Sequence, residues 1–168
     1  VVTGGTVDRG KAEFDCAKIP VLFEDGGVQK SLYIDDCEYK VIPVSMGNPH
    51  AVIFMDDDFD IDRFEIEKIG PKFEKNPAFP EGVNTEFVKV ISPDAFKMRV
   101  WERGSGETLA CGTGACAVGS AAVRMGIADE GKDLKVILPG GELIINYTPE
   151  RVLLTGGAVT AFTGEVCI

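Results

Sequence analysis

The stretch ERGSGETLACGTGACAVG, residues 102–119, decides the fold. It predicts a helix with so little side-chain bulk that the backbone of neighbouring elements must pack close to it on most sides. We expect the helix to run from about Gly112 to Met125, with Gly126 in the C-terminal cap position. Most of its residues are glycine, alanine or serine. Glycine inside a helix costs up to about 1 kcal/mol relative to alanine, so such a composition is useful only where other elements pack very closely. The stretch therefore favours an α+β fold, with a mixed or antiparallel sheet wrapped around a central small-residue helix.

Most of the remaining chain predicts strands separated by turn residues. The expected strands are 19–26 paired with 28–34, 39–46 with Pro43 marking an edge or bulge, 51–55, 86–91 paired with 96–101, a hairpin over 134–147, and one or two closing strands within 151–168. A further helix is expected over residues 60–70, capped by an aspartate and ended by Gly70-Pro71.

Length, charge and cysteine number exclude several classes of protein. The 168 residues suit one domain, with two small lobes possible. Seventeen basic and 27 acidic residues give a net charge of −10, which argues against nucleic acid as a partner. No apolar run approaches the roughly 20 residues of a membrane span, and the N-terminus has no signal-peptide pattern. Five cysteines, an odd number, favour reduced thiols, so we expect a cytoplasmic protein with no membrane partner.

The position of Cys111 has a chemical consequence. The start of a helix favours negative charge, which predicts a lowered pKa for the thiol. The backbone N–H groups of Gly112, Thr113 and Gly114 could then hold a carboxylate. A buried, inert cysteine is the alternative, and local sequence does not separate the two. Cys116 lies five residues on, about 140° around the helix, so the sulfurs face apart; with one histidine in the chain, no metal site is expected.

Polar residues in three further stretches are candidates for ligand contacts. Asn48 and His50 lie in a turn before a strand, and Asn84 begins a strand after a proline-rich loop. Glu102 and Arg103 follow a strand and could hold an ammonium and a carboxylate respectively. The alternatives are ordinary turn asparagines, a surface histidine and a solvated charge pair.

Taken together, three motifs resemble the C-terminal half of the diaminopimelate epimerase family. They are SMGNPH (45–50), FPEGVN (79–84) and ERGSGETLACGTGACA (102–117), in this order and spacing. The similarity extends through LPGGEL (138–143) and LTGGAVTAFTGEV (154–166). The resemblance implies a lobe whose strands enclose a central helix, shared with proline racemases, and an enzyme independent of pyridoxal phosphate, so no cofactor is expected.

The same resemblance implies a function in lysine and peptidoglycan precursor biosynthesis. Members of the family interconvert LL- and meso-diaminopimelate, using one cysteine thiolate to remove the α-proton and a second thiol to return a proton to the opposite face. The residues that match functional positions are Cys111 as one of the two cysteines, Glu102 and His50 at the reacting amino group, Gly112 and Thr113 at the α-carboxylate, and Asn48, Asn84 and Arg103 at the distal end of the substrate.

The chain departs from the family in one respect. The other cysteine of the family lies in a CGNG-type motif of an N-terminal lobe, and this sequence, which begins at Val1, has no such stretch. Neither Cys16 nor Cys37 has glycine and asparagine neighbours. We therefore expect residues 1–168 to be the C-terminal domain, inactive alone, with diaminopimelate as its small-molecule substrate, the missing lobe as its partner, and a possible homodimer.

Two other functions fit the motifs less completely. One is a hydrolase or amidotransferase in which Cys111 is a nucleophile activated by His50, although no third orienting residue is evident in the sequence. The other is a non-catalytic module that only binds a carboxylate ligand.

Overall fold

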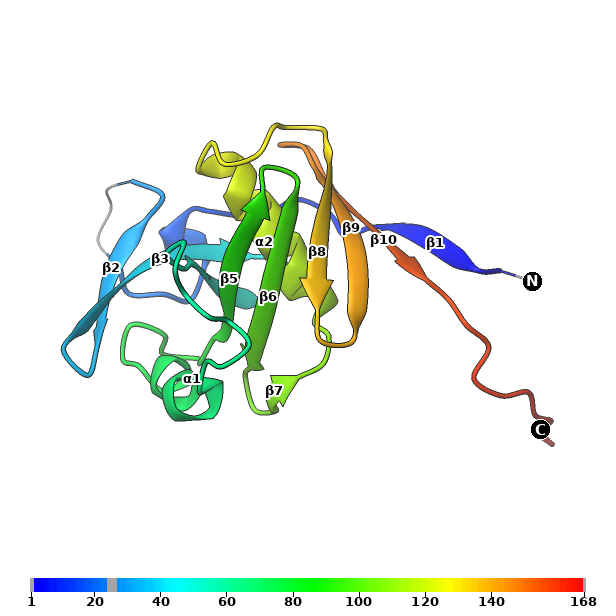
Figure 1. The fold of residues 1–168 in the computed structure, drawn as a ribbon, viewed down its shortest axis with the longest axis horizontal. Helices are drawn as coiled ribbons and strands as arrows, with labels where there is room; N and C mark the ends of the chain where they lie inside the picture. Colours follow the sequence, from blue (N-terminus) through cyan, green and yellow to red (C-terminus); the bar gives the residue numbers. More distant parts are fainter. Residues whose placement is uncertain (1, 24–26, 168) are drawn as a thin grey trace.

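A computed structural model of the chain describes residues 2–23 and 27–167, with one mixed sheet and two α-helices (Figure 1). The strands in the sheet follow the order β1-β10-β9-β8-β6-β5-β4-β3-β2, and β7 pairs with β6 outside this path. The elements are β1 (Gly4–Asp8), a 3₁₀ turn (Cys16–Lys18), β2 (Lys30–Ile34), β3 (Cys37–Ser45), β4 (Pro49–Phe54), α1 (Ile66–Glu74), β5 (Asn84–Ser92), β6 (Ala95–Glu102), β7 (Gly106–Thr108), α2 (Gly112–Arg124), β8 (Asp133–Leu138), β9 (Gly141–Tyr147) and β10 (Val152–Gly157). The pairs β4–β5 and β6–β8 are parallel, which makes the sheet mixed, as the α+β prediction allowed.

The central helix is α2, and the sheet curves around it (Figure 1). It contacts β3, β4 and β5 as well as β8, β9 and β10, so strands from both halves of the sheet enclose it. All nine residues from Gly114 to Ala122 are buried. A methyl group at Gly119 would lie 2.6 Å from Cγ2 of Ile145 on β9, closer than any real contact. The small residues are therefore required by close packing, as the sequence predicts.

The two faces of the sheet carry separate apolar clusters. Because neighbouring residues of a strand point to opposite faces, Val88 packs with α2 while Phe87 packs with α1. On β6, Phe96, Met98 and Val100 share one face and are fully buried in the apolar cluster that includes α2. The β5–β6 and β8–β9 hairpins form as predicted.

The predicted pairing of residues 19–26 with 28–34 is wrong. Residues 24–26 lie outside the described part of the chain, and 19–23 form no strand. Instead β2 pairs with β3 through a two-residue turn, in which Asp35 and Asp36 have φ of 49° and 65°. Aspartate tolerates this left-handed conformation, which suits a tight hairpin. The β2–β3 pairing ends at Val41, so Pro43 lies beyond it and pairs only with Ala51 of β4.

Helix α1 begins and ends later than the sequence predicts. The sequence predicts that Gly70-Pro71 ends the helix, but the helix passes through both residues to Glu74. Gly70 serves packing, because a methyl group there would lie 2.4 Å from Cδ2 of Trp101. The indole N–H of Trp101 also donates to Oε2 of Glu74 across 2.7 Å.

The ends of the described chain extend away from this body. Strand β1, which the sequence did not predict, pairs with β10, the one closing strand of the predicted 151–168 segment. Residues 158–167 continue beyond β10 without regular structure on the same side as β1 (Figure 1). Within residues 2–23 and 27–167, neither helix has the length and apolarity needed to cross a membrane.

Candidate functional site

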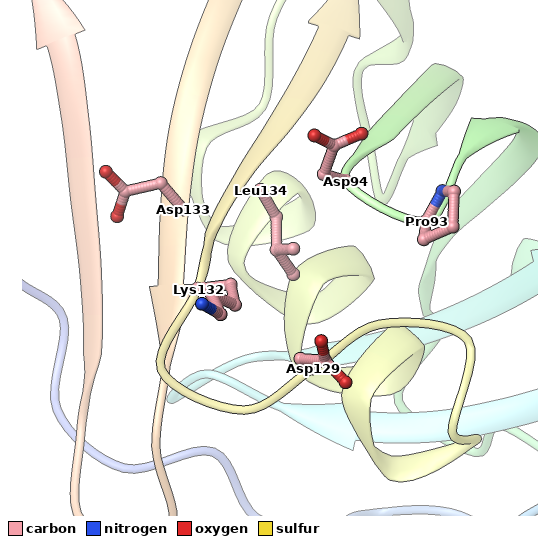
Figure 2. A pocket seen from close by; sticks show the side chains of 6 residues that line it. All are labelled: Pro93, Asp94, Asp129, Lys132, Asp133 and Leu134. Carbon is pink, nitrogen blue, oxygen red and sulfur yellow. The ribbon is translucent and has the colours of Figure 1, made fainter.

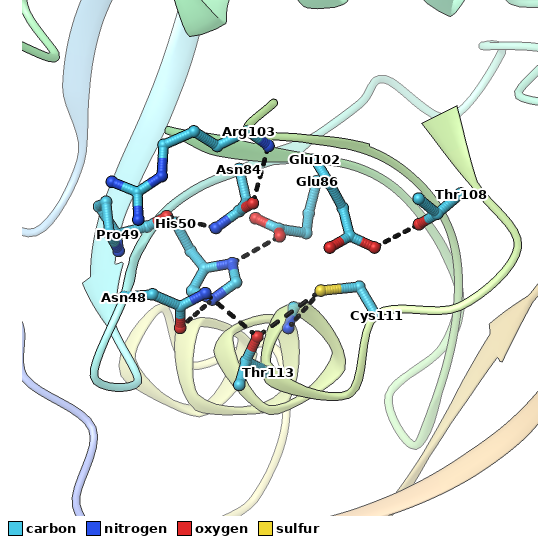
Figure 3. A network of polar contacts seen from close by, with 11 residues as sticks. Asn48, Pro49, His50, Asn84, Glu86, Glu102, Arg103, Thr108, Cys111 and Thr113 are labelled. Carbon is cyan, nitrogen blue, oxygen red and sulfur yellow. Dashed lines mark hydrogen bonds and ion pairs between the residues drawn. The ribbon is translucent and has the colours of Figure 1, made fainter. Parts of the chain in front are cut away.

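Three polar side chains end the apolar rows that line α2. Side chains alternate between the two faces of a strand, so residues two positions apart share a face. His50 therefore lies on the same face of β4 as the buried Val52, Glu86 on the same face of β5 as Val88, and Glu102 on the same face of β6 as Val100. Since β4, β5 and β6 are neighbours in the sheet, the three side chains gather at one end of the helix. Figure 3 shows them around the first turn of α2, with Cys111 facing them.

Cys111 is the N-terminal cap of α2. Its backbone is extended, and its Sγ accepts a hydrogen bond from the N–H of Gly114 across 3.3 Å. The first intrahelical bond runs from the N–H of Ala115 to the carbonyl of Cys111 across 2.9 Å. The N–H groups of Gly112 and Thr113 precede that bond, so they are donors available to an anion. The helix starts where the sequence predicts.

The predicted lowering of the Cys111 pKa is wrong for this structure. Burial raises the pKa of the thiol to about 11, and the negative charge of Glu86 acts in the same direction. The hydrogen bonds from Thr113 and from the Gly114 N–H lower the pKa, as a helix start should, but they are the smaller effects. Only 6% of the residue surface is exposed, which explains why desolvation dominates. Cys111 is accordingly a neutral thiol at neutral pH in this chain.

His50 is fully buried, so the alternative of a surface histidine is excluded. Its Nδ1 lies 2.6 Å from Oε1 of Glu86, and its Nε2 lies 3.1 Å from Oδ1 of Asn48. Both ring nitrogens are therefore engaged by residues other than Cys111. Sγ of Cys111 instead contacts Oγ1 of Thr113 at 3.6 Å and the Gly114 N–H. The cysteine–histidine dyad of a hydrolase or amidotransferase is not formed.

The two asparagines hold parts of the site together. Nδ2 of Asn48 lies 3.5 Å from Oγ1 of Thr113, a long contact that joins the β3–β4 turn to α2. Asn84 is buried, donates from Nδ2 to the carbonyl of Pro49 and accepts the N–H of Arg103 at its Oδ1. The amide of Asn84 therefore joins the strand ends that carry His50 and Glu102.

Glu102 and Arg103 do not form with each other the solvated charge pair that the sequence left open as the alternative to ligand contacts. Glu102 accepts a hydrogen bond from the hydroxyl of Thr108 on β7. The guanidinium of Arg103 donates to the carbonyl of Glu81, and Figure 3 shows its side chain extending past Asn84, on the far side from Cys111. The carboxylate and the guanidinium therefore reach different ends of the site.

Two features lie apart from this site. Cys116 is fully buried in the core, and in the part of the chain that is described no group of three or more histidine, cysteine or acidic residues could hold a metal ion. An open hollow of about 390 Å³ lies beside the loop that follows α2 (Figure 2). Cys111 caps the other, N-terminal end of that helix. It shares no residue with the site and is lined by Pro93, Asp94, Asp129, Lys132, Asp133 and Leu134.

The sequence model of diaminopimelate epimerase matches residues 42–161, a range that includes all the site residues above. The chain belongs to the diaminopimelate epimerase family. A diaminopimelate epimerase of Desulfovibrio desulfuricans is 50% identical over 99% of this chain and 60% of its own length. That of Acetivibrio thermocellus is 53% identical over 95% of this chain and 56% of its own length. The chain thus spans less than two thirds of these curated relatives.

The fold of the diaminopimelate epimerase family is also seen in solved structures with little sequence identity. A predicted epimerase of Pseudomonas aeruginosa superposes with a TM-score of 0.55 at 16% identity, over 92% of this chain and 55% of that protein. This likeness confirms the predicted fold class, a diaminopimelate-epimerase-like lobe.

Sequence reasoning missed Glu86, the buried partner of His50. The motifs of the diaminopimelate epimerase family did not point to it, because it follows FPEGVN and was assigned only to a strand. A signal was present: in the alternating segment 86–91, Glu86 shares a face with Val88 and Val90. A carboxyl in register with two valines predicts a buried charge, and buried carboxyls require a partner.

Proposed function

We propose that this chain is the C-terminal half of a diaminopimelate epimerase and supplies one face of its active site. Cys111 exchanges a proton with the α-carbon on this face. A second cysteine, in a lobe outside residues 1–168, acts on the opposite face. Inversion at carbon requires a group on each face, because a single base would return the proton to the side from which it came. When the thiolate takes the α-proton and the other thiol gives its own, the two cysteines exchange protonation states.

The observation that carries the proposal is the placement of one buried thiol at the start of α2, opposite two glutamates and a histidine. Free N–H groups at Gly112 and Thr113 suit the α-carboxylate of an amino acid, and Glu102 suits its ammonium. His50 supports the same amino group. Asn48, Asn84 and Arg103 take the distal amino-acid end, which Arg103 can reach from its position beyond Asn84.

The raised pKa of Cys111 fits the role of the protonated cysteine in such a pair. A neutral thiol is the form that donates a proton to the carbanion. When the substrate binds, its ammonium near Glu102 offsets the negative charge that raises the thiol pKa, which favours the thiolate needed for the reverse direction. The N–H of Gly114 then stabilises that thiolate. The cytoplasmic setting and a homodimer remain predictions from the cysteine number and the family resemblance.

The proposal is tested in the complete two-lobe enzyme by exchanging each cysteine of α2. Cys111→Ala should abolish epimerisation, whereas Cys116→Ala should leave the rate within a few fold, since its sulfur only fills the core. Loss of activity in Cys116→Ala with activity retained in Cys111→Ala would contradict the assignment. The non-catalytic alternative is tested by calorimetry: diaminopimelate binding to the complete enzyme without any turnover would support it instead.

A further inference from the structure

Glu86 and His50 form a buried pair in which the placement of the protons is constrained by their neighbours. Neither side chain has any exposed surface, and Nδ1 and Oε1 lie 2.6 Å apart, a distance typical of charge-assisted hydrogen bonds. At that distance one proton must lie between the two atoms, carried by either the imidazole or the carboxyl group. Oε2 of Glu86 has no hydrogen-bond partner within the described chain, so Oε1 is the atom through which Glu86 acts.

The other ring nitrogen is constrained by Asn48. Its Oδ1 lies 3.1 Å from Nε2 of His50, while its Nδ2 lies toward the hydroxyl of Thr113. A carbonyl oxygen only accepts, so Nε2 must carry a proton and donate it. With one proton at Nε2 and one shared at Nδ1, the pair has no net charge. Neutrality is what burial requires, because an unpaired charge in this core would be costly.

The groups around the Glu86–His50 pair also favour a retained proton. Burial raises the pKa of Glu86, and the nearby carboxylate of Glu102 on β6 raises it further, while His50 lowers it. The thiol of Cys111 faces the pair from α2 and is itself disfavoured as a thiolate by Glu86. A proton retained between Glu86 and His50 therefore limits the negative charge at this end of the helix.

We propose that Glu86 is a positioning residue that fixes the orientation of His50 and keeps its Nε2 as a hydrogen-bond donor facing Asn48 and the start of α2. The effect of this arrangement on epimerisation rests on the proposed function. The arrangement itself does not, because it follows from the contacts of the two side chains. Glu86 thereby determines which nitrogen of His50 meets the substrate, and in which protonation state.

The chain offers a direct readout, because it contains one histidine. Long-range proton–nitrogen correlation spectra of the tag-free 168-residue chain, labelled with ¹⁵N-histidine, report both ring nitrogens of His50 at neutral pH. We expect Nε2 to be protonated and Nδ1 to show a strongly hydrogen-bonded proton. In Glu86→Gln the Nδ1 signal should move, because an amide cannot share a proton as a carboxyl group does. Glu107→Gln is the matched control, since Glu107 on β7 bonds Arg99 and not His50, and it should leave both signals in place.

Two results would overturn the proposal: an unprotonated Nε2 in the unaltered chain, or a Glu86→Gln spectrum that superposes on it. Backbone amide spectra establish that each variant is folded. In the complete enzyme, Glu86→Gln should lower kcat on the order of 10²-fold with little change in KM, the size of effect that misplacing a functional group causes. If the His50 signals move but kcat does not, the coupling of Glu86 to His50 stands and the part assigned to His50 in the proposed reaction is wrong.

Discussion

The N–H of Gly114 donates to Sγ of Cys111, so the proposed acid–base residue is also the N-terminal cap of the central helix. A cap ties the position of the sulfur to the helix start, and a helix start normally favours a thiolate. Here burial and the Glu86 carboxylate outweigh that effect. The site thus combines a fixed sulfur with a thiol that is protonated at neutral pH.

This balance predicts how the reactivity of Cys111 depends on pH. Its pKa is raised from 9.0 to about 11, so the reactive thiolate should form only as the pH rises through that range. Site-resolved mass spectrometry of iodoacetamide labelling measures the rate at each cysteine, with the exposed Cys37 as an internal reference. Glu102→Gln should shift the Cys111 curve to lower pH, because the negative charge of Glu102 adds to burial in raising the pKa of the thiol. A curve with its midpoint below 9.0 in the unaltered chain would contradict this account.

Close packing around α2 predicts the effect of the smallest possible change. Gly119→Ala places a methyl group 2.6 Å from Cγ2 of Ile145 and should reduce the free energy of unfolding by about 1–3 kcal/mol. Denaturant titration measures the loss. In a double-mutant cycle with Ile145→Ala, the combined loss should be smaller than the sum of the two single losses, because the clashing atom is absent. Additive losses would show that Gly119 does not contact Ile145.

Helix α1 offers a second packing test with its own optical probe. Gly70→Ala should displace the indole of Trp101, since the added methyl group would lie 2.4 Å from Cδ2. Trp101 is the one tryptophan in the chain, so its fluorescence maximum should move as the ring leaves its place against α1. Lys68→Ala, on the exposed side of the same helix, is the control and should leave the emission unchanged. An unshifted spectrum in Gly70→Ala would show that Trp101 does not pack on Gly70.

The sequence predicted most of what local patterns encode. The small residues of 112–125 predicted the enclosed helix, and alternation predicted the β5–β6 and β8–β9 hairpins. The first hairpin was misassigned because the Asp35-Asp36 turn was overlooked in favour of the glycines at 26 and 27. In the sequence Gly70 reads as a helix breaker, because the residue that requires a glycine there, Trp101, is 31 positions away. Such distant contacts leave no periodic signal.

In the site, too, local motifs were readable from the sequence, whereas contacts between distant residues were not. The motifs predicted Cys111, Glu102, His50 and the asparagines as candidates, and the structure brings them together, but their environment depends on the fold. The sequence predicts the pKa of Cys111 in the wrong direction because it shows the helix start, whereas the burial of the thiol comes from the whole fold and the charge of Glu86 comes from β5. The double role of Asn84 as a donor to Pro49 and an acceptor from Arg103 likewise requires three segments to meet.

The central claim, that this chain carries one face of a two-faced site, is tested most directly in deuterated water. The chain and the complete two-lobe enzyme are each incubated with LL-diaminopimelate, and α-deuterium uptake is followed by NMR. We expect rapid uptake with the complete enzyme, none with its Cys111→Ala variant, and none above background with the 168-residue chain. Uptake by the chain alone at the rate of the complete enzyme would contradict the claim.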